Sequence, residues 1–157
     1  MHWADYTAER LSKERGTKLV ACSGITPSGE FHIGHLREIL SAEMIHRACL
    51  DADLDCKYIF IVDSMDPLRR VYPFLSDEYE QFIGCPLAFI PAPDSEGKPD
   101  YGGISYAEHF LGPFLDALTE IGVYPEVIMN HETYQNGHFA EKIDAAIEKA
   151  DEIKHII

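Results

Sequence analysis

Two histidines, His32 and His35, lie three residues apart at the end of a glycine-rich stretch that begins at Ser23 and reads SGITPSGEFHIGH. An apolar run precedes the stretch and helical spacing follows it, which is the order of a strand, a turn and a helix. The N-terminus of such a helix offers unpaired backbone N–H groups and the positive end of the helix dipole. Because both imidazoles can also donate hydrogen bonds, we expect this segment to bind phosphate and to stabilise charge on it.

Two other roles are open to a pair of histidines with this spacing. The pair can be a plain surface feature, or it can belong to a metal site if further ligands join it. His109, His131 and His138 are available as ligands, but no short spacing connects them to the pair. The sequence therefore favours contact with a nucleotide, and we predict no metal ligands in this chain.

The surrounding elements alternate between strand and helix. Residues 18–23 and 57–62 are apolar runs that predict parallel strands joined by a helix over 33–50, a right-handed βαβ unit. The first run is nearly continuous in apolar residues, so we expect it to be covered on both faces. A third strand is predicted over 124–129. The helix before it opens with a capping box from Ser105 to Glu108 and ends at Gly122.

Four further segments complete the pattern. Residues 3–15 predict a short amphipathic helix, and a helical turn over 76–82 has Ser76 as its expected cap. Residues 84–104 carry four of the nine prolines and predict an irregular excursion. The expected buried positions of the helix after Ser105 and of the tail from Gly137 are Tyr106, Phe110, Phe114, Leu118 and Ile121, and Phe139, Ile143, Ile147, Ala150 and Ile157.

This order predicts an α/β fold in which residues 1–157 form one domain. It corresponds to the first half of a Rossmann-like doubly wound sheet, with three parallel strands, flanking helices and the irregular insertion. Ligands of such sheets bind at the carboxyl ends of the strands. Asp63 follows the second strand, where its carboxylate can bind an ammonium group, a ribose hydroxyl or Mg²⁺. Asp66 is expected to cap the turn before Pro67.

Four landmarks in this chain resemble one family. The run from His32 to His35 is the HIGH signature of class I aminoacyl-tRNA synthetases, and the wider stretch is similar to class I lysyl-tRNA synthetase. Further matches in family order are HWA from His2, DxxDPLR from Asp63 and SYAEHF from Ser105. The landmarks span nearly the whole chain, whereas the family protein is several times longer. The resemblance implies the HUP-type fold and the activity of a lysine–tRNA ligase.

The resemblance also implies roles for individual residues. Lysine is activated with ATP to lysyl-adenylate and then transferred to tRNA(Lys), and the two histidines of the signature stabilise the transition state. His32 and His35 are accordingly the expected catalytic residues. The residues expected to bind ATP are Thr26, Pro27, His32, Gly34 and His35, and those expected to bind the amino acid are Gly24, Thr26 and Asp63. Mg²⁺ would accompany ATP, and zinc would belong to a region beyond this chain.

Parts of the family pattern do not occur in these residues. The KMSKS loop that holds the ATP triphosphate has no counterpart, and the zinc-binding cysteines and anticodon-binding region would follow residue 157. The last helical segment also reaches residue 157 without a breaker. We therefore expect an incomplete fragment that is inactive alone. The alternatives are a small stand-alone adenylyltransferase such as pantetheine-phosphate adenylyltransferase, whose Ser/Thr and Arg motif is missing, and a truncated synthetase paralogue without catalysis.

Composition limits the partners and the compartment. With 27 acidic and 13 basic residues the net charge is −14, which repels a polyanion over most of the surface. RNA would need a local basic patch, such as Arg37, Arg69 and Arg70, or other domains. The 46% hydrophobic content favours a globular core.

Cysteine usage and hydropathy point to the cytoplasm. The four cysteines show no C-x-x-C spacing, and with no signal peptide they are expected to be buried thiols in the cytoplasm. No apolar run approaches the roughly 20 residues of a membrane-spanning helix, so no membrane contact is expected. The sequence makes no prediction of oligomeric state.

Overall fold

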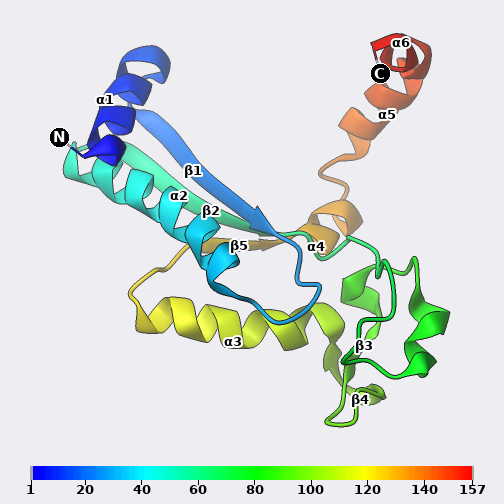
Figure 1. Cartoon of the computed structure of the whole chain (residues 1–157). Coiled ribbons are helices and arrows are strands. Elements are labelled where there is room, and N and C mark those ends of the chain that lie inside the picture. Colours follow the sequence, from blue (N-terminus) through cyan, green and yellow to red (C-terminus); the bar gives the residue numbers. More distant parts are fainter. Residues whose placement is uncertain (1, 157) are drawn as a thin grey trace.

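A three-stranded parallel sheet, with two long helices on one face, forms the larger part of the structure (Figure 1). The computed structural model describes residues 2–156. In chain order the elements are α1 (Trp3–Arg15), β1 (Lys18–Ile25), α2 (Ile33–Asp51), β2 (Asp55–Val62), the 3₁₀ helices η1 (Asp77–Phe82) and η2 (Leu87–Phe89), β3 (Pro91–Pro93), β4 (Pro99–Ser105), α3 (Tyr106–Glu120), β5 (Glu126–Met129), α4 (Asn130–Gln135), α5 (Ala140–Glu148) and α6 (Ala150–Ile156).

The sheet has the order β1-β2-β5, and both pairings are parallel. Lys18 pairs with Asp55 and Ile25 with Val62, so β1 and β2 end level with each other. Met129 at the end of β5 pairs with Val62 as well. The predicted α/β class with three parallel strands and flanking helices is confirmed, and the three carboxyl ends meet at one edge.

Only one face of the sheet is covered, which corrects the expectation for the first strand. Along β1, exposed and buried residues alternate, with Ala21 buried and Val20 59% exposed. Each connection, β1 to β2 and β2 to β5, advances in the same direction across the sheet. Because such crossovers are right-handed, α2 and α3 lie on the same face. The open face also exposes Cys22, whereas Cys49 and Cys56 are buried as expected.

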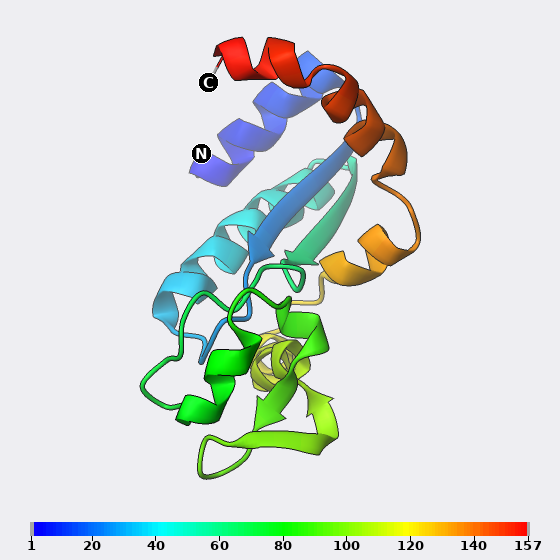
Figure 2. The same cartoon turned by 90° about the vertical axis from the view of Figure 1, so that its right-hand side faces the viewer.

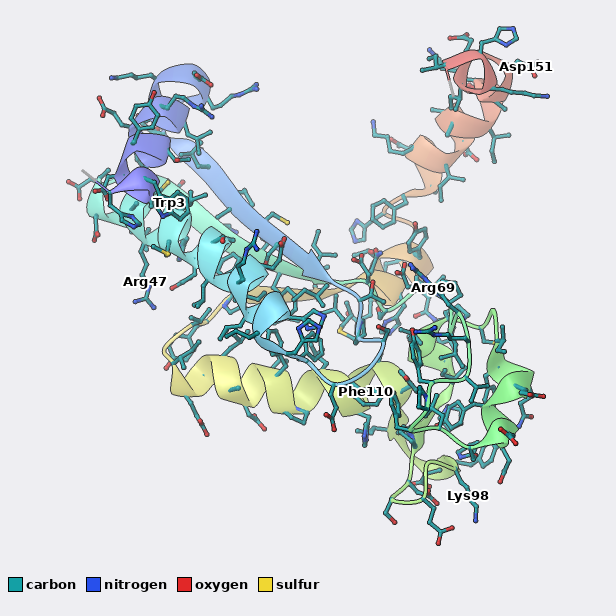
Figure 3. The ribbon with its side chains drawn as sticks, in the orientation of Figure 1. Trp3, Arg47, Arg69, Lys98, Phe110 and Asp151 are labelled. Carbon is teal, nitrogen blue, oxygen red and sulfur yellow. The ribbon has the colours of Figure 1, made fainter. Side chains whose placement is uncertain are left out.

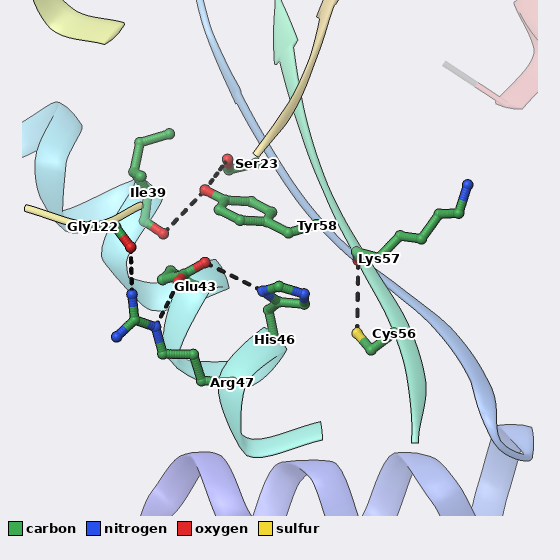
Figure 4. Close-up of polar contacts among 9 residues, drawn as sticks. All are labelled: Ser23, Ile39, Glu43, His46, Arg47, Cys56, Lys57, Tyr58 and Gly122. Atoms are coloured by element: carbon green, nitrogen blue, oxygen red, sulfur yellow. Dashed lines mark hydrogen bonds and ion pairs between the residues drawn. The ribbon is translucent and has the colours of Figure 1, made fainter. Parts of the chain in front are cut away.

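Polar contacts attach α2 to its neighbours within the main core (Figure 4). The buried Tyr58 hydroxyl donates to the Ile39 carbonyl oxygen at 3.1 Å. Glu43, also buried, accepts from Arg47 Nε at 2.6 Å, and Arg47 Nη2 donates to the Gly122 carbonyl oxygen at 2.6 Å. These contacts connect α2 to β2 and to the turn that precedes β5.

Residues 67–105 form a second small core on the N-terminal half of α3. The predicted irregular excursion contains an antiparallel hairpin, in which Pro93 of β3 pairs with Pro99 of β4. A two-stranded ribbon tolerates these prolines because its outer edges need no N–H donors. Figure 3 shows Lys98 at the far end of this hairpin and Phe110 near the start of α3. The hydroxyl of Ser76, the expected helix cap, is buried and makes no hydrogen bond.

The tail differs from the single helix that its spacing predicted. From Gly137 onward it divides into α5 and α6, and residues 140–156 are all exposed. Figures 1 and 2 show α5 and α6 standing away from the end of the sheet where α4 begins. Ile121, expected to be buried, is 50% exposed because it is the C-cap of α3. Ile157 lies outside the described residues.

None of the helices within residues 2–156 has the length and apolar content needed to cross a lipid bilayer.

Candidate active site at the carboxyl ends of the parallel strands

The loops that leave β1, β2 and β5 bring polar side chains together at one edge of the sheet. Thr26, after β1, donates its hydroxyl hydrogen to Asp66 Oδ2 at 2.8 Å. Asp63, directly after β2, accepts from Asn130 Nδ2 of α4 at 3.4 Å. A methyl group built on Gly24 would lie 3.7 Å from Asp63 Oδ2, so this carboxylate lies beside the backbone of β1. The site therefore draws on all three strands.

His32 is the N-cap of α2. Its ring Nδ1 accepts from the backbone N–H of Gly34 at 3.1 Å. An Nδ1 atom that accepts carries no hydrogen, so the ring hydrogen of the neutral imidazole is on Nε2. His32 thus keeps a donor on the side of the ring away from the helix, and its side chain is exposed.

His35 completes a reciprocal cap. Its Nδ1 accepts from the backbone N–H of His32 at 3.0 Å, so its ring hydrogen is also on Nε2. The two rings have centroids 4.0 Å apart and are tilted by 40°. Burial, followed by the nearby His32 ring, lowers the pKa of His35 from its ordinary value. Its imidazole is therefore neutral at pH 7 and serves as a hydrogen-bond donor rather than a cation.

Gly34 allows this arrangement because it has no side chain. A methyl group at this position would lie 2.8 Å from Cε1 and 2.9 Å from Nδ1 of His32, closer than carbon and nitrogen atoms normally approach. The glycine between the histidines is therefore required by the cap itself, in addition to any contact with a ligand.

Phe31 holds the histidine loop against α3, a role that sequence reasoning missed. Its ring stacks on Phe114 with centroids 4.2 Å apart and meets His35 edge-on at 5.0 Å. Phe31 packs against both hydrophobic cores. The buried Tyr106 adds a second attachment, since its hydroxyl donates to the Ser28 carbonyl oxygen at 2.8 Å. Phe114 and Tyr106 of α3 thus hold the histidine loop in place.

Asp63 is a titratable group at the strand ends whose surroundings disfavour its charged form. Burial, and then the charge of Asp66, raise the pKa of Asp63 above its ordinary value, while the hydrogen bond from Asn130 opposes this shift. Asp63 is only partly buried, and the edge of the sheet leaves it accessible to a ligand. A cation placed beside it would relieve the unfavourable charge.

Two cavities meet at the histidine loop. A smaller one of about 370 Å³ is lined by the predicted site residues Gly24, Thr26, Gly34 and His35, together with Ile25, Ser28 and Glu38. A larger one of about 770 Å³ shares Ser28 and His35 with it and extends past His32 and His109 to the β3–β4 turn. His109 thus joins the histidine pair in space, although its place in the sequence shows no connection.

The remaining predicted residues have varied environments. Pro27 is fully buried and therefore lies inside the loop, away from the surface that a ligand would reach. Glu108 completes the predicted capping box, and the hydrogen bond from the Ser105 hydroxyl lowers its pKa. Arg69 approaches Asp66 at 3.5 Å, and its side chain is largely exposed. Asn130, beside Asp63, was not anticipated.

Comparisons with known proteins give one consistent result. The family model described as tRNA synthetases class I (K) matches residues 1–157. The chain is 45% identical to lysine–tRNA ligase 1 of Methanosarcina acetivorans and 45% identical to a lysine–tRNA ligase of Archaeoglobus fulgidus. It is 44% identical to a lysine–tRNA ligase of Methanocaldococcus jannaschii. Each match includes all of this chain but only 28%, 30% and 29% of the respective relatives.

Proposed function

The chain belongs to the family of class I (K) tRNA synthetases, and from this membership we propose that it supplies the histidine half of the ATP and lysine site of a lysine–tRNA ligase. The chain spans less than a third of the length of the relatives it matches. The activity of the whole protein, lysine activation followed by transfer to tRNA, is therefore part of the proposal. The match over all 157 residues leaves no support for the stand-alone adenylyltransferase alternative.

The paired cap of His32 and His35 is the observation that carries this proposal. In lysine activation the carboxylate of lysine attacks the α-phosphorus of ATP, a P–O bond forms, and pyrophosphate leaves with the electron pair of the bond that breaks. Negative charge grows on the phosphate oxygens during this step. Both imidazoles have Nδ1 occupied by a backbone N–H, so both direct an Nε2–H donor away from the helix. Donors held in advance at such a position stabilise the transition state.

Asp63 is the group we propose for the lysine substrate. It lies beside Gly24 at the end of β1 and has a raised pKa, caused first by burial and second by Asp66. An ammonium group of lysine beside Asp63 would favour its charged form. ATP would bind with Mg²⁺, for which carboxylate oxygens are suitable ligands. Because ATP, lysine and tRNA are all available in the cytoplasm, we propose that the protein acts there.

Binding to the chain itself tests the proposal. We expect Mg-ATP to shift the backbone amide resonances of Gly24 and Gly34 in an ¹⁵N-labelled sample. A lost hydrogen bond to a charged group is worth about 1.5–3 kcal/mol, so His32→Ala should raise the Kd for ATP roughly 10- to 150-fold. His138→Ala, which changes an exposed histidine of the α4–α5 connection, is the matched control. Equal ATP affinity of the two variants would contradict the role of His32.

Catalysis is tested separately by ATP–pyrophosphate exchange with lysine. No K-x-S-K-like run occurs in the 157 residues, so we expect binding without robust exchange by the isolated chain. Rapid lysine-dependent exchange would show that the second signature is dispensable and would refute this part of the proposal. If ATP does not bind at all, the remaining alternative is a paralogue without catalysis.

A further inference from the structure

Side-chain contacts continue the pairing of β2 and β5 beyond the ends of the two strands. Val62 and Met129 form the last backbone pair of this ladder. The residues that follow them are Asp63 and Asn130, and Asn130 Nδ2 donates to Asp63 Oδ1 at 3.4 Å. Asn130 has no part in the function proposed above. Because it contacts the carboxylate assigned there to lysine, it can influence how that carboxylate meets a ligand.

A second pair fixes the start of α4 against the end of β2. The Ser64 side chain is fully buried, and its hydroxyl oxygen accepts from the backbone N–H of His131 at 3.1 Å. The same oxygen lies 2.8 Å from His131 Nδ1. A serine hydroxyl can donate one hydrogen bond while it accepts another, so both contacts form at once when Nδ1 carries no hydrogen. Asn130, the residue before His131, is therefore held at a fixed place beside β2.

The chemistry of the neighbours fixes the orientation of the Asn130 amide. An ionised carboxylate only accepts hydrogen bonds, so the NH₂ group of Asn130 faces Asp63 and the amide oxygen faces the other way. That oxygen lies 3.1 Å from the hydroxyl of Thr133, which also donates to the Asn130 backbone carbonyl oxygen at 2.6 Å. The Thr133 hydroxyl thus supports the orientation in which Asn130 presents its N–H donors to Asp63.

The contact with Asn130 makes the two oxygens of Asp63 different. Oδ1 accepts from Asn130, whereas Oδ2 lies beside β1, 3.7 Å from the position that a methyl group on Gly24 would take. Gly24 is exposed and lines the smaller cavity of about 370 Å³, which His35 also lines. Oδ2 is therefore the oxygen on the side of this cavity.

We propose that Asn130 is a positioning residue for amine recognition, which holds Oδ1 of Asp63 so that Oδ2 accepts a hydrogen bond from the ammonium group of the substrate. Asn130 acts through Asp63 and need not touch the ligand. The inference rests on the proposed function, which assigns lysine to Asp63. A neutral amide suits this place, because it donates to the carboxylate without a positive charge. A cationic side chain would neutralise Asp63 and weaken its attraction for an amine.

The charges around Asp63 increase the importance of this donor. Burial, and then the charge of Asp66, raise the pKa of Asp63, and the hydrogen bond from Asn130 opposes the rise. Cys22 on β1 is another titratable group close to Asp63, since burial and then the Asp63 charge raise the pKa of Cys22. The guanidinium group of Arg69 approaches Asp66 at 3.5 Å. Without Asn130, Asp63 would take up a proton at a higher pH, and a protonated carboxyl group does not attract an amine by charge.

The first test measures the affinity for lysine by calorimetry. Asn130→Ala removes the amide, and Asn130→Leu removes it while keeping a side chain of similar size, which guards against loss of folding. Each variant should raise the Kd for lysine at pH 7 about tenfold, as expected for the loss of one hydrogen bond. Asn136→Ala changes the exposed C-cap of the same helix and should leave the Kd unchanged. Unaltered lysine affinity in both Asn130 variants would overturn the proposal.

The second test measures the pKa of Asp63 from the pH dependence of its carboxyl ¹³C resonance. In both Asn130 variants this pKa should be higher than in the unaltered chain, because the hydrogen bond that opposes the rise is gone. Their lysine binding should also begin to weaken at a higher pH as the solution is acidified. A residue that only stabilised the fold would change neither quantity. An unchanged pKa of Asp63 would show that the amide does not hold the carboxylate.

The third test concerns the orientation of the amide. Thr133→Val removes the hydroxyl and keeps the shape of the side chain, whereas Thr133→Ser keeps the hydroxyl. The valine variant should raise the Kd for lysine roughly two- to fivefold, and the serine variant should bind lysine like the unaltered chain. If valine and serine have the same effect, the Thr133 hydroxyl does not orient Asn130.

The unaltered chain and Asp63→Asn distinguish failure of this inference from failure of the proposed function. If the unaltered chain binds lysine, Asp63→Asn does not and the Asn130 variants bind normally, the inference alone is wrong. If the unaltered chain does not bind lysine, the proposed function is wrong at Asp63. Mg-ATP should shift the amide resonance of Gly34 equally in the unaltered chain and in the Asn130 variants. Loss of that shift would show that the variants disturb the whole site and would refute a role specific to Asp63.

Discussion

Replacing Gly34 with alanine should weaken nucleotide binding and leave the stability of the fold nearly unchanged. The added methyl group would lie 2.8–2.9 Å from the His32 ring, so the imidazole must move and lose its bond from the Gly34 N–H. Loss of an N-cap costs about 1 kcal/mol, whereas alanine in place of glycine within a helix adds about 0.5–1 kcal/mol. The two effects nearly cancel, and we expect little change in the free energy of unfolding. Displacement of His32 removes a donor to phosphate, worth about 1.5–3 kcal/mol.

The measurements are urea unfolding and ATP titration, with Gly112→Ala as the matched control. Gly112 lies inside α3, away from the histidine loop and directly before Pro113, so alanine there should leave ATP affinity unchanged. A double variant decides the mechanism. If Gly34→Ala acts through His32, it should hardly change ATP affinity in a His32→Ala background. Fully additive losses would refute this reasoning and would indicate that the methyl group blocks the nucleotide directly.

Three further predictions concern the core and the titratable groups. Tyr58→Phe should destabilise the fold by about 1–2 kcal/mol because it leaves buried polar partners unsatisfied, whereas Tyr101→Phe, at a 73% exposed position, should leave urea unfolding unchanged. Asp63→Asn should stabilise the protein at pH 7 and abolish lysine binding in calorimetry. Burial, and then Asp66, raise the pKa of Asp63 in the folded protein. Protonated Asp63 therefore contributes fully to the free energy of unfolding below pH 3.8, and this contribution is lost as the pH rises through the folded pKa. The stability advantage of the asparagine variant should accordingly vanish in acid. The pKa of His35 is lowered in the folded protein, so the unfolded chain binds more protons below about pH 6.5. The free energy of unfolding should therefore fall from about pH 7.5 to about pH 5.5. A His35→Gln variant, which retains the cap acceptor, should show a weaker dependence of stability on pH.

Features that depend on close neighbours in sequence could be predicted. The capping box of Ser105 and Glu108 involves residues three apart, and the βαβ unit follows from apolar runs and their spacing. The histidine pair was located correctly at a helix N-terminus, yet its capping role was missed. Capping rules expect Ser, Thr, Asp or Asn at the first position and Glu or Gln at the fourth. In this chain the Nδ1 atoms of His32 and His35 serve in their place.

Features that depend on tertiary contacts could not be predicted. Phe74 looks like one more aromatic residue of an irregular stretch, and its tertiary contacts with Gly97 and Phe110 place it beside the histidines. His109 reaches the same cavity because α3 packs beneath the loop. The exposure of one face of β1 could not be predicted either, because the apolar content of a strand does not reveal whether one or two layers cover it.

The position of α3 explains why the excursion and the sheet act as one site. Its N-terminal half contributes Tyr106 and Phe110 to the second core, and its C-terminal half contributes Phe114 to the main core. Phe31 packs against both cores and also contacts the His35 ring. A shift of either core against the other would therefore move the histidine loop. The excursion thus has a structural reason to lie where it does, because it holds one wall of the larger cavity at a fixed distance from the donors on α2.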